Sequence, residues 1–137
     1  MKEQLALTTW KNKAISLAYK ARLHGLAAYR LARACISPTA ELRRLERIET
    51  GRAGAGERAV LECAGKWFAL SEKLGRRPSC LVRSLIVAAL LRHEGHPARI
   101  AFGARKEGEG MGGHCWVCVG DRVVYGEAKG YQELVDG

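Results

Sequence analysis

The residues whose types and spacing could carry chemistry lie in the last third of the chain, in the stretch GGHCWVCVGDRVVYGE, residues 112–127. This stretch holds one histidine, His114, two cysteines and a closing glutamate, Glu127. A histidine beside a carboxylate can serve as the oriented general base of a nucleophile. A histidine with two cysteines can instead bind zinc or belong to a redox site. The spacing decides between these three kinds of site.

The Gly120–Asp121 pair lies between two apolar runs and predicts a tight two-residue turn between antiparallel strands. Counting back from that turn places Trp116 opposite Tyr125 and His114 opposite Glu127, on one face of the sheet. Asp121 stays at the tip of the turn, roughly 20 Å from the histidine. The sequence therefore predicts a pair between His114 and Glu127, which by itself could also be purely structural.

The alternation of side chains along a strand argues against a metal or redox site. Cys115 and Cys118 are three residues apart, so on a strand they point to opposite faces of the sheet. His93 and His96 could add ligands, but they lie where a helix is expected to end at Gly95. We therefore expect neither a metal nor another cofactor.

A nucleophile for the histidine is found at Cys80, which lies at the expected start of a buried helix, directly after RRPS. The helix dipole and the neighbouring Arg76 and Arg77 favour the thiolate there, and the first-turn amides offer an oxyanion hole. Cys35 and Cys63 have none of these features. Cys80, His114 and Glu127 thus form a candidate nucleophile, base and acid triad.

The periodicity of apolar residues predicts the elements that must position this triad. Helices are expected over 5–35, from an N-cap at Ser37 to a stop at Gly51, over 57–74, and from Cys80 to Gly95. Strands follow over 98–105, 114–119 and 122–127. The loop between the first two, residues 106–113, is either a mobile wall of the cleft or a plain hairpin loop. The order indicates an α+β fold, with helices packed on a small antiparallel sheet.

The length of 137 residues predicts one domain, with a basic helical segment over 1–56 and a catalytic core over 57–137. The net charge is +9, and residues 1–56 carry eleven Lys and Arg against four Glu. This excess could serve an acidic partner, a solvated face or nucleic acid, of which nucleic acid is the least favoured because few aromatic residues accompany the charges. The longest apolar run, Leu85–Leu91, is far too short to span a membrane, and with no signal peptide we expect a cytoplasmic protein with free thiols.

The segments CLVRSLIVAALLRHEGHPARIAFGAR and GGHCWVCVGDRVVYGE together resemble the transglutaminase-like core, which is papain-like in its helix-borne cysteine. More closely, they resemble the stand-alone leader peptidases of lasso-peptide biosynthesis. That family has a Cys-Leu at the helix start, an Arg-x-x-Gly at its end, and a His-Ala-Trp-Val strand before a glycine turn and an acid. Cys80, His114 and Glu127 match its nucleophile, base and acid. The match covers roughly residues 76–135. The usual acid is aspartate, and Cys115 replaces the usual alanine.

The resemblance implies a cysteine peptidase that removes the leader from a ribosomally made precursor peptide, before a separate ATP-dependent macrolactam synthetase closes the ring. It further implies a separate leader-recognition protein as partner, with that synthetase as a further candidate partner. Two alternatives remain open. One is an acyltransferase that uses the same thioester, and the other is a non-catalytic basic binding module.

Overall fold

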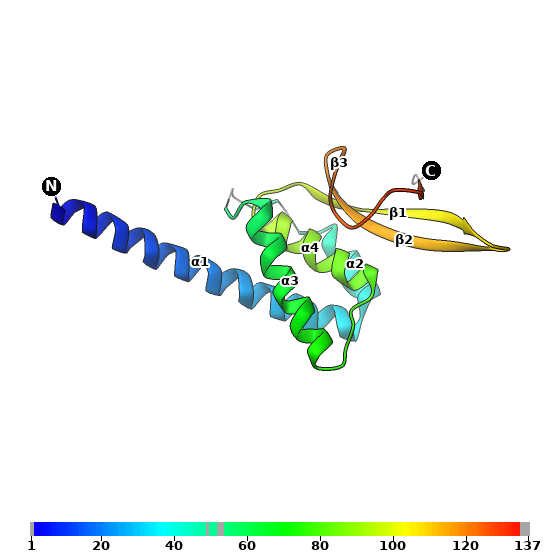
Figure 1. Cartoon of the computed structure of the whole chain (residues 1–137), viewed down its shortest axis with the longest axis horizontal. Coiled ribbons are helices and arrows are strands. Elements are labelled where there is room, and N and C mark those ends of the chain that lie inside the picture. Colours follow the sequence, from blue (N-terminus) through cyan, green and yellow to red (C-terminus); the bar gives the residue numbers. More distant parts are fainter. Residues whose placement is uncertain (1, 49, 52–53, 135–137) are drawn as a thin grey trace.

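The computed structural model describes residues 2–48, 50–51 and 54–134, and for residues 2–16 and 19 it describes the backbone alone. The fold is α+β, as predicted: helices come first and pack on a four-stranded antiparallel sheet (Figure 1). The helices are α1 (Lys2–Ile36), α2 (Pro38–Leu45), α3 (Glu57–Lys73) and α4 (Cys80–His93). The strands are β1 (Ala98–Glu107), β2 (Gly110–Val119), β3 (Arg122–Tyr125) and β4 (Gln132–Glu133).

Helix α4 is the centre of the fold. Its residues Leu85–Leu91 are all buried, because α1, α2, α3, β1 and β2 contact it from every side. This explains why the sequence is apolar nearly all round the helix. The second half of α1 covers α4 with small buried side chains such as Ala27 and Ala34, whereas its first half projects away from the rest of the chain (Figure 1).

Helix α2 begins as predicted but ends early. Ser37 caps it by accepting a hydrogen bond from the Ala40 amide (3.4 Å), with Pro38 at the first helical position. The predicted stop at Gly51 is wrong, since α2 ends at Leu45. Gly51 instead passes over the end of α4, where its amide donates to the Arg92 carbonyl (2.8 Å) and a side chain would collide with the His93 carbonyl.

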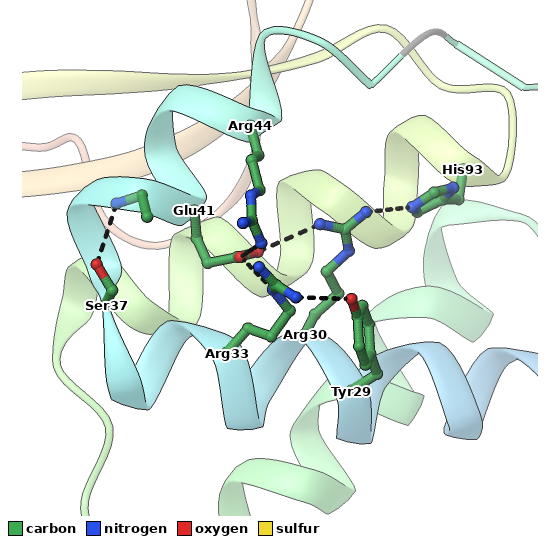
Figure 2. A network of polar contacts seen from close by, with 8 residues as sticks. Tyr29, Arg30, Arg33, Ser37, Glu41, Arg44 and His93 are labelled. Atoms are coloured by element: carbon green, nitrogen blue, oxygen red, sulfur yellow. Dashed lines mark hydrogen bonds and ion pairs between the residues drawn. The ribbon is translucent and has the colours of Figure 1, made fainter.

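Two buried glutamates bind arginines of α1 and thereby neutralise part of the positive charge in the first half of the chain. Glu94, which caps α4, accepts from Arg22 (2.9 and 3.0 Å) and from the Ala55 amide (3.1 Å). Glu41 lies between three arginines, Arg30, Arg33 and Arg44, and Arg30 also reaches the His93 ring (Figure 2). A buried carboxylate needs such partners, because an unpaired charge in the interior is costly.

The sheet has the order β3-β2-β1-β4. Strands β1 and β2 form a long hairpin whose tip extends beyond the helices (Figure 1). The segment 106–113 is therefore not the loop that the sequence predicted: β1 continues to Glu107, β2 starts at Gly110, and only two residues turn between them. Alternating glycines obscured the strand pattern here, because glycine has no side chain to show the period of two.

The turn between β2 and β3 is confirmed at Gly120–Asp121, with Val119 paired to Arg122 and Cys118 to Val123. The predicted register fails beyond that point, because a β-bulge follows and Tyr125 pairs with Val117 rather than with Trp116. Strand β3 then ends, so Glu127 is not the cross-strand partner of His114. A bulge places two residues of one strand opposite one of its neighbour, which shifts every later pair by one.

Candidate active site

Cys80 is the first residue of α4, as predicted, and is half-buried. The helix is capped by Ser79, whose hydroxyl accepts a hydrogen bond from the Val82 amide (3.2 Å). The start of an α-helix presents amide groups that have no partner within the helix. The cysteine thus lies at an end of α4 that favours negative charge.

The arginine that shares the cavity of Cys80 is Arg83, and not the predicted Arg76 or Arg77. Arg77 pairs with Glu72 (3.6 Å) on the surface, and Arg76 and Arg77 line a separate groove. Arg83, three residues after Cys80 on α4, lines the same cavity as the cysteine. Its position could have been inferred from helical spacing, since residues three and four apart share a helix face.

His114 lies in the middle of β2, where it pairs with Gly103 of β1. Its ring packs against two aromatic rings, Tyr131 at a centroid distance of 4.9 Å and Trp116 at 6.2 Å. The sequence predicted the strand position of the histidine but gave no sign of Tyr131, which follows β3 and returns to the sheet as the residue before β4.

Glu127 follows a close crossing of the chain over β2. Gly126 has a φ of +88°, and a Cβ there would lie 3.0 Å from the Trp116 Cβ and 3.3 Å from its Cα. Only glycine fits this conformation and this distance. The crossing brings the exposed Glu127 to the cavity that holds Cys80 and His114, whereas Asp121 stays in the turn.

The cavity at the start of α4 measures about 300 Å³. Its walls come from α4, β2 and the segment around the end of β3, and consist of Cys80, Arg83, Ser84, His114, Cys115, Tyr125, Gly126 and Glu127. All three predicted triad residues thus line one cavity, but strand alternation places the His114 side chain on the Trp116 and Cys118 face of β2, opposite the Cys115 face that meets α4. Within the described part of the chain, no hydrogen bond joins these three triad side chains. Catalytic hydrogen bonds commonly tighten only when substrate binds.

Cys115 lies close enough to Cys80 for the two thiols to interact. Its Sγ donates to the Ser84 hydroxyl (3.6 Å), one helical turn after Cys80. Burial raises the pKa of the Cys115 thiol, the Ser84 hydrogen bond lowers it and the proximity of Cys80 raises it again, for a pKa of about 11, so Cys115 remains a neutral thiol. Cys118 faces the other side of the sheet and packs with Ala101 and Trp116. The two cysteines of the C-x-x-C therefore point apart, as strand alternation predicted.

A larger cavity, about 780 Å³, lies between α2 and the outer edge of β1, near Leu42, Arg92 and Phe102. No cysteine or histidine lines it, so its size does not make it the reactive centre. The other two histidines considered as ligands have structural contacts: His93 with Arg30 (3.1 Å), and His96 with the Ala55 carbonyl (2.8 Å). The described residues contain no group of three metal-ligating side chains.

Comparison with known proteins accounts for this arrangement of a helix-borne cysteine and a strand-borne histidine. The sequence pattern of the transglutaminase-like superfamily matches residues 17–136. The chain belongs to the transglutaminase-like superfamily. Members of this superfamily are generally cysteine hydrolases or transferases. The match also begins well before Cys80 and includes the second half of α1.

The comparison goes no further than the superfamily. Neither a curated protein nor a solved structure gave a significant match to the chain. Across the described residues, no helix combines the length and the apolar character that crossing a membrane requires.

Proposed function

We propose that this transglutaminase-like protein is a cysteine peptidase that removes the leader from a ribosomally synthesised lasso precursor peptide before macrolactam formation. The observation that carries the proposal is the shared cavity of Cys80, His114 and Glu127. The resemblance of the two motif segments to lasso leader peptidases narrows the superfamily chemistry to this substrate class.

Peptide cleavage follows from the roles of the three side chains. His114 takes the proton of the Cys80 thiol, and the sulfur attacks the scissile carbonyl carbon. Amides at the start of α4 stabilise the oxyanion. The C–N bond then breaks, His114 protonates the leaving amine of the core peptide, and the leader stays bound as a thioester. His114 next deprotonates a water molecule, which releases the leader as a carboxylic acid and restores the thiol. Glu127 holds the histidine tautomer throughout.

The test is incubation with the precursor peptide and its recognition protein, followed by mass analysis. Cys80→Ala should abolish cleavage. Glu127→Gln should slow turnover by about 10²-fold or more, while Glu127→Asp keeps or gains activity. Asp121→Asn is the matched control, because that carboxylate lies in the turn, and it should behave as wild type. An inactive Asp121→Asn beside an active Glu127→Gln would refute the role of Glu127.

The products separate this function from its alternatives. A leader that ends in a free carboxylic acid indicates water as the acceptor, whereas a leader joined to an amine indicates an acyltransferase. A chain that binds the precursor without any loss of mass, and whose Cys80 resists thiol reagents, would be a non-catalytic binding module. The superfamily match is compatible with both hydrolysis and acyl transfer, so this measurement decides between them.

A separate recognition protein is the expected partner, and the projecting half of α1 is the candidate docking element (Figure 1). The candidate docking residues that the sequence offers are six basic residues of the first half of the chain: Lys11, Lys13, Lys20, Arg22, Arg30 and Arg33. The three arginines bind Glu94 and Glu41 within the fold, so the proposal now rests on the three lysines. Binding of the partner–leader complex should weaken as salt rises, and equal affinity at low and high salt would contradict it.

A further inference from the structure

The segment after β3 returns across the sheet and is fixed to it at several points. Gly130 has a φ of +85°, and the Tyr131 amide donates to the Ala128 carbonyl (3.1 Å), which closes a turn. Strand β4 then pairs with β1 through Gly103–Glu133 and Ala104–Gln132, and the Leu134 amide donates to the Phe102 carbonyl (2.7 Å). Tyr131 is thus held on the sheet by backbone hydrogen bonds on both sides.

These bonds place the Tyr131 ring against His114. The rings of His114, Trp116 and Tyr131 form a triangle with centroid distances of 4.9, 6.2 and 6.3 Å. The Arg105 guanidinium lies 4.6 Å from the centre of the Tyr131 ring, and Glu107 neutralises that arginine at 2.7 Å. The tyrosine ring is therefore braced between β1 and the histidine.

The packing of these three rings depends on Gly103, a glycine in the neighbouring strand β1. Gly103 is the β1 partner of His114, and a Cβ at Gly103 would lie 2.5 Å from the Trp116 ring and 3.0 Å from the Tyr131 Cβ. Both aromatic residues thus occupy the space that any larger residue would need. This packing restricts the His114 ring on the side of Tyr131 and Trp116.

We infer that Tyr131 is a positioning residue for His114 and fixes the orientation of its ring at the cavity that Cys80 also lines. The inference rests on the proposed function. An aromatic ring suits this task because it packs against the imidazole, here at an interplanar angle of 32°, and makes no hydrogen bond that would fix the wrong tautomer. It also accepts a cation within about 6 Å, so the imidazolium formed during the reaction stays in place.

The test compares Tyr131→Leu, which keeps apolar volume without a ring, with Tyr131→Phe, which keeps the ring. In the full chain with precursor and recognition protein, Tyr131→Leu should lower kcat about tenfold or more, because a small displacement of a catalytic group is costly. KM should stay within about twofold, and Tyr131→Phe should restore kcat to near wild type. Equal kcat in the two variants, or a change confined to KM, would overturn the inference.

Proton NMR of the histidine rings supplies a readout that needs no substrate. Ring currents of Tyr131 and Trp116 should displace the His114 signals, which are assigned by their loss in His114→Gln. Tyr131→Leu should move these signals and Tyr131→Phe should not; unmoved signals in the leucine variant would overturn the ring contact. If wild type cleaves no precursor, the proposed function fails while this measurement still decides the position of the ring.

An exposed side chain gives a second variant in case Tyr131→Leu does not fold. Arg105→Gln removes the cation that braces the tyrosine ring, at a side chain that is 46% exposed. It should move the His114 signals in the same direction as Tyr131→Leu, and by less. Arg58→Gln, which breaks a surface pair at 3.3 Å on α3, is the matched control and should leave them unchanged.

Discussion

Replacing Gly103 by alanine adds one methyl group at the position in β1 that faces His114 across the sheet. The new Cβ would lie 2.5 and 2.6 Å from two ring carbons of Trp116, and 3.0 Å from the Tyr131 Cβ. Carbon atoms normally stay about 3.5–4.0 Å apart, so roughly 1 Å of overlap must be relieved. Trp116 is only 3% exposed and its ring is rigid, so it cannot turn away into solvent.

The cost of this overlap follows from overpacking in protein cores, which typically destabilises by about 1–3 kcal/mol. Replacing glycine within a strand returns part of that cost, about 0.5–1 kcal/mol, because the unfolded chain loses conformational freedom. We therefore expect Gly103→Ala to lower the free energy of unfolding by about 1–2 kcal/mol. If Trp116 and Tyr131 move, His114 moves with them, and cleavage should slow by about tenfold to a hundredfold.

Urea denaturation measures the stability and the precursor assay measures the rate. Gly113→Ala is the matched control: this glycine adjoins His114 in β2, and a Cβ there meets nothing within 4 Å. It should change neither quantity appreciably. If Gly103→Ala is as stable and as active as Gly113→Ala, the aromatic cluster does not hold His114, and both the packing argument and the role of Tyr131 are refuted.

Three further predictions concern thiols, pH and helix capping. Iodoacetamide should label Cys80 well before Cys115 at pH 8, since burial raises the pKa of Cys115 to about 11, and peptide mapping shows the order. Burial and then Arg30 lower the pKa of His93 below 6.5, so the unfolded state binds more protons there and stability should fall as pH drops below 6.5; the melting temperature of His93→Gln should depend less on pH in that range. Ser79→Ala and Ser37→Ala each remove a helix cap and should cost about 1 kcal/mol in urea denaturation, but only Ser79→Ala should also slow cleavage, because α4 carries the cysteine. If the two cap variants affected cleavage equally, the capping of α4 would have no specific role in catalysis.

Local sequence signals were enough to predict the elements that carry the candidate nucleophile and base. Cys80 was expected at a helix start, and α4 begins there. Apolar spacing predicted the helix over 57–74, which agrees with α3. The Gly120–Asp121 turn was also correct, since its two residues favour one backbone geometry. Such signals lie within a few residues of the feature that they specify, so they can be read without the fold.

The sequence placed Glu127 near His114 by a strand pairing that the structure does not have. The strand count paired Glu127 directly with His114, but the bulge before Tyr125 removes that pairing. Glu127 reaches the cavity through the crossing at Gly126 instead. A bulge in a short strand depends on what packs against each side of the sheet, and the sequence of the strand does not show that packing.

The sequence by itself thus indicated the candidate chemistry and predicted the helix that presents Cys80 and the strand that presents His114. Only the tertiary structure decided where α2 ends, that residues 106–113 belong mostly to strands, and that arginines of α1 bind Glu94 and Glu41. It also decided that Tyr131 packs on His114. Caps, turns and periodicity are local interactions, whereas these features join segments that are distant in sequence, and their free energy comes from burial and pairing that exist only once the chain has folded.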